Sequence, residues 1–269
     1  MRQQSSLARL LASAALTAIL AAGLGGCQTM SDITGSLTPK KEASPDADPH
    51  RAVEVYGERY RADPRNAEAA LAYGQALRAT GQRSQAAAVL EQATIAHPAD
   101  KALLAAYGRA LADNGNFQQA FDVLSRAHSP DNPDWRILSV QGTALDQLGR
   151  HEEARRYYAS ALKIVPDEPS VLSNLGLSYV LSKNLPKAEE VLRQAYASGR
   201  ADARVRQNLG LVVGLQGRFA EAEQIVRADL PAEEAAANVA YLKQMLNRSD
   251  DTRTGSTGKM PIASLSRPQ

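Results

Sequence analysis

The sequence is poor in the residue types on which several classes of protein depend. Cysteine occurs once, at Cys27, and aromatic residues make up 5% of the 269 residues. A single cysteine excludes a disulfide framework and a metal site built on thiolates. Histidine occurs at four scattered positions, none with another histidine three or four residues away: His50, His97, His128 and His151. We therefore expect no metal and no cofactor.

Neither the net charge nor any catalytic motif indicates a nucleic-acid-binding protein or an enzyme. The chain carries 31 Lys and Arg against 29 Asp and Glu, a formal charge of +2. Arg2 and Arg9 supply two of these charges, so removal of residues 1–26 leaves a charge of about zero, from +2 minus 2. Nucleic-acid binding needs an excess of positive charge, so we expect no nucleic-acid partner. The sequence has neither a phosphate-binding GxxxxGK[ST] loop nor a supported Ser-His-Asp arrangement, so we expect no enzyme.

Residues 1–26 have the pattern of a secretory signal peptide. Arg2 and Arg9 make the start positive, and residues 10–24 read LLASAALTAILAAGL without a charge. This order of a basic start and an apolar run is typical of a signal peptide. The run is shorter than the roughly 20 residues of a membrane-spanning helix. Two glycines follow it, and then Cys27.

The stretch Leu24-Gly25-Gly26-Cys27 resembles the lipobox of bacterial lipoproteins, with a small residue before the cysteine and an aliphatic residue three positions before it. The resemblance implies cleavage before Cys27 and acyl chains, such as palmitate, on its thiol and new amino terminus. Three acyl chains anchor a protein stably to a membrane. Because Gln28 and not aspartate follows, the resemblance implies an outer-membrane lipoprotein that faces the periplasm. An ordinary cleaved signal with a stray cysteine is the alternative.

Two segments lack any apolar period. Residues 27–49 are polar and rich in Ser, Thr, Pro and Asp, which is typical of a flexible tether. Residues 249–269 are rich in Ser, Thr, Gly and Pro, and we expect a disordered tail. The folded domain should therefore span residues 50–248.

This domain has a period of 34 residues. One glycine series is Gly74, Gly108, Gly142, Gly176 and Gly210. One alanine series is Ala86, Ala120, Ala154, Ala188 and Ala222. A second glycine series is Gly81, Gly115, Gly149 and Gly217, broken by Lys183. Repeats of this length indicate a stacked array in which each unit buries its apolar face against its neighbours.

The period and its small residues resemble the tetratricopeptide repeat, in which two antiparallel helices, A and B, form each unit. The resemblance implies an all-α fold, a right-handed superhelix or α-solenoid. It places the first glycine series where helix A crosses helix B, the alanines as the other halves of those contacts, and the second glycine series in the turn. Large residues at the predicted core positions agree with it: Leu90, Leu124, Tyr158, Leu192 and Val226.

Five repeats fit the register: 67–100, 101–134, 135–168, 169–202 and 203–236. We expect a helix at about residues 50–62 to cap one end and a helix over residues 232–248 to cap the other. Two departures from the family pattern fall in the fifth repeat, where Arg206 replaces an aromatic residue and Asp229 replaces alanine. Pro130 and Pro133 predict an altered connection between the second and third repeats.

In this family one face of the A helices lines a concave groove that binds peptide segments. The groove positions in the first three repeats are polar and include Gln75, Arg78, Arg109, Asp113, Arg136 and Asp146. Those in the last two repeats are mostly amide or apolar and include Asn174, Leu177, Leu181, Asn208 and Leu211. The arginines could bind a carboxylate, and the asparagines a peptide backbone. Alternatively, the asparagines are family residues without a ligand, and the leucines pack on the C-terminal cap helix.

The closing segment GLQGRFAEAEQIVRADLPAEEAAANVAYLKQML, together with the lipobox, tether and repeats, resembles the TadD lipoproteins of tight-adherence (Flp) pilus systems. The resemblance implies a role in pilus assembly, in which the protein helps to localise or assemble the outer-membrane secretin, as a pilotin does. A different periplasmic scaffold, for outer-membrane protein assembly or cell-wall enzymes, is the alternative.

Overall fold

The structure, a computed structural model, describes residues 48–129 and 131–255, with side chains as far as residue 248. The predicted signal peptide, Cys27 and residues 27–47 of the tether lie outside the described residues, as do residues 256–269. Within the described residues the chain is helical and forms no strand; the one β-bridge joins Ser129 and Asn132.

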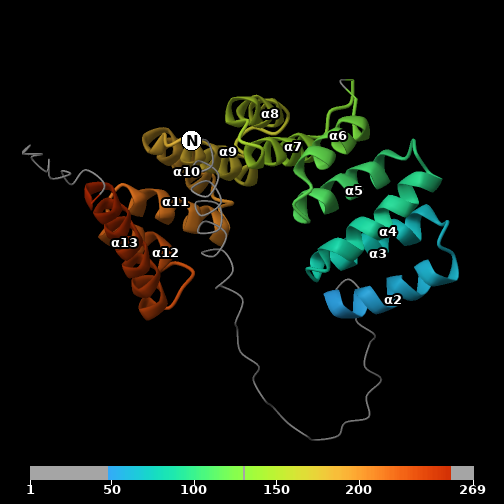
Figure 1. Ribbon diagram of the computed structural model, residues 1–269, viewed down its shortest axis with the longest axis horizontal. Helices are drawn as coiled ribbons and strands as arrows, with labels where there is room; N and C mark the ends of the chain where they lie inside the picture. The colour runs from blue at the N-terminus through green and yellow to red at the C-terminus, as the bar shows by residue number, and fades with distance from the viewer. Residues whose placement is uncertain (1–47, 130, 256–269) are drawn as a thin grey trace, which may run out of the picture. The chain divides into compact units, whose positions relative to one another are not determined.

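Helix α2 (Pro49–Ala62) comes first, followed by five helical hairpins and helix α13 (Ala232–Gly255) (Figure 1). We call the first helix of each hairpin an A helix: α3 (Ala67–Ala79), α5 (Lys101–Asp113), α7 (Trp135–Gln147), α9 (Pro169–Leu181) and α11 (Ala203–Leu215). The second helices are the B helices: α4 (Arg83–Ala96), α6 (Phe117–Ala127), α8 (His151–Ile164), α10 (Leu185–Ala197) and α12 (Phe219–Val226). The fold is a tetratricopeptide-repeat α-solenoid.

Each A helix begins with a side-chain cap that recurs with the repeat. The capping residues are Asn66, Asp100, Asp134, Glu168 and Asp202, and each accepts a hydrogen bond from a backbone N–H in the first turn of the next helix. Such a cap satisfies donors that the first turn leaves unpaired. The 34-residue spacing of these caps is a sequence signal that fixes where every A helix starts.

The crossing of the two helices within a hairpin depends on the first glycine series. A Cβ atom at Gly74 would lie 2.5 Å from Leu90 Cγ, and one at Gly142 would lie 2.6 Å from Tyr158 Cε1. The same relation joins the glycine and the residue 16 positions later in the other three hairpins. The predicted alanine series also lies close, since a Cβ atom at Gly108 would lie 3.4 Å from Ala120 O and one at Gly210 would lie 3.4 Å from Ala222 O. The large residue 16 positions later fills the space, because it lies directly over the missing side chain.

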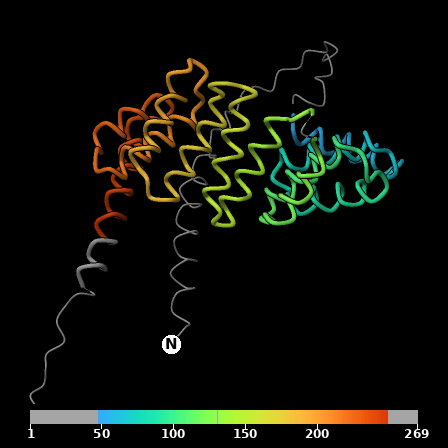
Figure 2. The backbone as a smooth tube through the Cα atoms, turned by 90° about the horizontal axis from the view of Figure 1, so that it is seen from above, coloured from blue at the N-terminus to red at the C-terminus, as the bar shows by residue number. Residues whose placement is uncertain are grey.

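Successive helices pack against each other along the chain (Figures 1 and 2). In addition, each A helix contacts the next A helix, whereas among the described residues no B helix contacts another B helix. The A helices are thus closer together than the B helices. This difference in spacing curves the array and places the A helices on its inner, concave side.

The structure corrects two sequence-based boundaries. Pro49, assigned to the tether, is the first residue of α2, because proline fits the first turn of a helix and Asp48 caps it. Residues 249–255, assigned to the disordered tail, continue α13 as a helix. No proline or glycine interrupts that helix between Ala232 and Arg253, so the backbone can continue past the predicted end.

A candidate peptide-binding groove on the A helices

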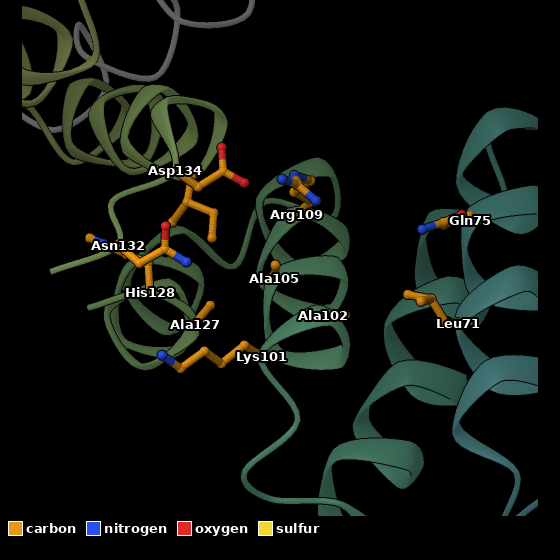
Figure 3. Close-up of a pocket in the computed structure, with 11 residues that line it drawn as sticks. Leu71, Gln75, Lys101, Ala102, Ala105, Arg109, Ala127, His128, Asn132 and Asp134 are labelled. Atoms are coloured by element: carbon orange, nitrogen blue, oxygen red, sulfur yellow. The ribbon is translucent and has the colours of Figure 1, made fainter. Parts of the chain in front are cut away.

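A cavity of about 330 Å³ lies on the concave side between α3, α5 and the start of α7. Its lining includes Leu71 and Gln75 from α3, and Ala102, Ala105 and Arg109 from α5. These residues occupy the groove positions predicted from the repeat register. Figure 3 shows Leu71 and Gln75 pointing from α3 toward α5, with Arg109 and Asp134 at one end of the cavity and Lys101 at the other.

The connection between the second and third repeats forms one wall of this cavity. Helix α6 ends at Ala127, whereas α7 begins at Trp135, so residues 128–134 lie between them. The corresponding connections after α4 and α8 span only residues 97–100 and 165–168. His128, Asn132 and Asp134 from the longer connection line the cavity. The expectation that this connection differs from the others is therefore confirmed.

Arg109 brings a positive charge to the cavity without a close acceptor. Among the described residues, none accepts a hydrogen bond from its guanidinium or pairs with it as an ion. Asp134 attracts it electrostatically, but that carboxylate accepts the Arg136 backbone N–H at 2.8 Å as the cap of α7. Burial and the nearby charges of Arg78 and Arg136 lower the pKa of Arg109. An arginine nonetheless stays charged in proteins, so the guanidinium is a cation without a hydrogen-bond acceptor among the described residues.

Arg78 and Arg136 are close enough to Arg109 to repel it, so the structure brings together the three arginines named from the sequence. Arg78 Nε donates to Asp113 Oδ2 at 2.7 Å. The Arg136 guanidinium lies over the Trp135 ring, 4.5 Å from its centroid. Two arginines thus have partners within the protein, and Arg109 is the one directed at the cavity.

The two asparagines of the groove each bind the preceding A helix. Asn174 Nδ2 donates to Ser139 Oγ at 3.1 Å, and Asn208 Nδ2 donates to Ser173 Oγ at 2.8 Å. Each bond joins two neighbouring repeats. These amides therefore have a structural role between repeats, and each retains one N–H and its carbonyl oxygen for other partners.

The groove leucines lie away from the cavity, on α9 and α11. Leu181 is 37% exposed, and Leu177 and Leu211 are partly buried. Helix α13 contacts α11 and α12 but not α9. Leu177 and Leu181 therefore do not pack under the C-terminal cap helix, which leaves an apolar strip beside the polar part of the groove.

Asp146, which the register assigned to the groove, is buried instead. Its carboxylate accepts hydrogen bonds from Tyr158 Oη at 3.0 Å and Ser178 Oγ at 2.8 Å, and His151 Nδ1 lies 2.8 Å away. Tyr158 stands where the other repeats have leucine or valine, and its hydroxyl reaches helix A. The tyrosine at this position was the sequence signal for a buried polar partner, and the repeat register alone could not identify Asp146.

No helix within the described ranges combines the length and the apolar character needed to cross a membrane. In the same part of the chain, no three His, Cys, Asp or Glu side chains gather as metal ligands would.

Comparison with known proteins supports the class of fold. A family profile described as tetratricopeptide repeat matches residues 118–169 and 139–203, and one described as anaphase-promoting complex, cyclosome, subunit 3 matches residues 50–127. Among curated proteins, no sequence matches the chain significantly.

Several solved structures share the arrangement of helices. PilW, a widely conserved type IV pilus biogenesis factor, is similar with a TM-score of 0.63 and 18% identity, over 72% of this chain and 92% of that one. A tetratricopeptide-repeat protein of Thermus thermophilus gives 0.58 and 22%, over 66% and 100%. The pilF protein of Pseudomonas aeruginosa gives 0.54 and 18%, over 72% and 97%. At these identities the likeness shows the fold alone.

Fold, repeat register and profile matches define a class of fold: this chain folds as a tetratricopeptide-repeat α-solenoid. Proteins with this fold act as scaffolds that bind peptide or protein partners in a groove.

Proposed function

We propose that the concave side of the A helices binds an extended or helical segment of a partner protein. The observation that carries this proposal is that the face formed by the A helices has a charged part and an apolar part. The cavity at Arg109 offers positive charge, and the strip of Leu177 and Leu181 on α9 offers apolar surface. A segment with a polar or charged end and an apolar end would match both parts, as helices and strands do when they dock in grooves.

We further propose that the protein is a lipoprotein anchored through Cys27 to the outer membrane, facing the periplasm, and that it assists assembly of a tight-adherence (Flp) pilus. In this role it localises or assembles the outer-membrane secretin. The support is the resemblance of the lipobox and of residues 214–246 to the TadD lipoproteins. PilW and pilF have the same fold, and the first is described as a pilus biogenesis factor, which is compatible with this role.

The groove is tested by Leu181→Asp, with Ile164→Asp as its matched control. Both residues end a helix, and they are 37% and 39% exposed, but only Leu181 lies on an A helix. Photo-crosslinking in the intact cell, from a probe residue at position 177, identifies the partner segment. We expect Leu181→Asp to weaken capture of that segment at least tenfold and Ile164→Asp to leave it unchanged. Equal capture by both variants would mean that the partner binds elsewhere.

Deletion of the gene tests the assembly role. We expect fewer heat-resistant secretin multimers and the loss of surface pili, both restored by the intact gene. Normal multimers and normal pili would reject the pilotin-like role and favour the other periplasmic scaffold.

The anchor is tested by Cys27→Ser. Without the thiol no thioether to lipid can form, so we expect the protein to move from the membrane fraction to the soluble periplasmic fraction. A variant that stays with the membrane would reject the lipid attachment.

A further inference from the structure

We propose that the cavity between α3, α5 and residues 128–134 is a subsite for a carboxylate, supplied by an acidic side chain of the bound segment. This inference rests on the proposed function, because it names the chemistry that one end of the groove recognises. The occupant is the partner protein, and the cavity selects it by charge.

The first support is the imbalance of charge around the cavity. Among the residues that line it, Lys101 and Arg109 are cations and Asp134, which caps α7, is the one carboxylate. Two positive charges and one negative charge leave an excess of one within the lining. An anionic group is therefore attracted to this end of the groove before it makes any contact.

The second support is the state of Arg109 itself. Its guanidinium is partly buried, its positive neighbours repel it, and no described residue supplies an acceptor. A charged group that has lost water without gaining a partner is unfavourable. A carboxylate could accept two parallel N–H bonds from the planar guanidinium, which is the geometry that arginine recognises best.

The third support is the shape of the lining. Ala102 and Ala105 form the part of the cavity wall on α5, and their small side chains leave room beside the helix for a second chain. Leu71 on α3 and Ile137 on α7 also line it and provide apolar contacts for the stem of a Glu or Asp side chain. Lys101 lies two turns before Arg109 on α5, a rise of about 12 Å along the helix. The cavity thus has a cation at each end.

The test uses small probes, so that it needs no identified partner. N-acetyl-glutamate N-methylamide represents an acidic side chain within a chain, N-acetyl-glutamine N-methylamide is its uncharged isostere, and N-acetyl-alanine represents a chain terminus. The readout is the NMR shift of ¹³C-labelled alanine methyls, with Ala102 and Ala105 in the cavity as reporters. We expect saturable shifts at these two methyls with the glutamate probe and none with the glutamine probe.

The variants are Arg109→Gln and, as a control, Arg156→Gln, which removes an exposed arginine from α8. We expect Arg109→Gln to weaken binding of the glutamate probe at least tenfold, because a charge-assisted hydrogen bond is lost. We expect Arg156→Gln to leave that binding unchanged. Equal shifts with the glutamine probe, or binding that survives Arg109→Gln in a folded protein, would overturn the proposal. Binding of N-acetyl-alanine alone would assign the site to a chain terminus and reject the side-chain source.

These outcomes are separable from the failure of the groove itself. If the glutamate probe does not bind but Leu181→Asp still prevents partner capture, the groove proposal stands and the carboxylate subsite is rejected. If the probe binds but Leu181→Asp has no effect on capture, the cavity recognises a carboxylate and the groove proposal is rejected.

Discussion

Lys183 occupies the position in the turn between helices A and B that is glycine in the other four hairpins. The turn residue is left-handed in all five hairpins, at Gly81, Gly115, Gly149 and Gly217, and at Lys183 with φ 61°. The Lys183 N–H donates to Val180 O at 2.8 Å, and the Asn184 N–H donates to Tyr179 O at 2.8 Å, so the fourth turn closes as the others do. A side chain with a Cβ in this conformation is strained, since only glycine adopts it freely.

We therefore expect Lys183→Gly to stabilise the protein by about 1 kcal/mol, the cost of the left-handed conformation less the extra freedom of glycine in the unfolded chain. Urea unfolding followed by circular dichroism measures the change. Lys183→Ala is the control, because it removes the long side chain and keeps the Cβ. A gain of equal size in the alanine variant would show that the backbone is not the cause.

The burial of Tyr158 could be predicted from the sequence, but its polar partner could not. The 34-residue period correctly placed it in the core, where it is 1% exposed. Its hydroxyl donates to Asp146, and burial raises its pKa well above the ordinary value. A register places each residue on a face of its helix, but it gives no information about which polar side chains meet across two helices. The buried Asp146 was therefore assigned to the groove.

At the scale of helices, two departures from the repeat pattern compensate each other. Arg206 on α11 binds Asp229 in the turn after α12 through both carboxylate oxygens, with Nε to Oδ2 at 2.6 Å. Arg206 also donates to Ala201 O at 2.7 Å. Helix α12 ends at Val226, and the ion pair holds the chain that follows it.

A double-mutant cycle tests this compensation. We expect Arg206→Ala and Asp229→Ala each to destabilise the fifth repeat, because each leaves a partly buried charge without its partner. The double variant should lose less than the sum, with a coupling free energy of about 1–2 kcal/mol for this bidentate pair. Chemical denaturation of the four proteins gives that value. Strictly additive losses would mean that the two residues contribute independently.

A second network joins α10 to α12. Glu189 accepts hydrogen bonds from Arg218 Nη1 at 2.7 Å, from Arg193 Nε at 2.8 Å and from Gln216 Nε2 at 2.7 Å. Glu221 pairs with the same two arginines and completes a closed set of charges. The bond from Arg218, above all, lowers the pKa of Glu189 from 4.5 to about 2.

The depressed pKa predicts a loss of stability in acid. A carboxyl with a lower pKa in the folded state stabilises that state at pH above 4.5, and this contribution disappears as the pH falls from about 4.5 to about 2. We expect Glu189→Gln to be less stable than the wild type at pH 7 and to show a smaller loss over that window. Thermal unfolding at pH 7, 4.5 and 3 measures both slopes. Parallel slopes in the two proteins would contradict the assignment to Glu189.

The helices themselves were largely predictable, and the connection at residues 128–134 was predictable only in part. A 34-residue period places ten helices because glycine, alanine and capping residues recur where the backbone demands them. Pro130 and Pro133 predicted an altered connection but not the cavity, which arises only where residues 128–134 meet α3 and α5. Similarly, no periodic signal set the end of α13, because its last turns have no further repeat against which to pack.

At the scale of the whole array, each repeat is stabilised by contacts with its neighbouring repeats. Each helix contacts only its near neighbours in the chain, so α13 protects the fifth repeat and not the first. Leu242 packs directly on Gly214, where an added Cβ would lie 2.6 Å from Leu242 Cδ2, and Ala235 of α13 is fully buried. The last repeat therefore depends on this helix to cover its apolar surface.

Leu242→Ala should consequently weaken one end of the molecule. We expect a loss of about 2–3 kcal/mol, the usual cost of removing a buried leucine, confined to the repeats nearest α13. Hydrogen exchange followed by mass spectrometry should show faster exchange in α11 and α12 and unchanged exchange in α3, α4 and α5. Tyr241→Ala, on the 51% exposed neighbour, is the control and should change neither region. Uniform loss of protection across all helices would show that the array unfolds as a single cooperative unit, in which case the cap stabilises the distant cavity at Arg109 as well.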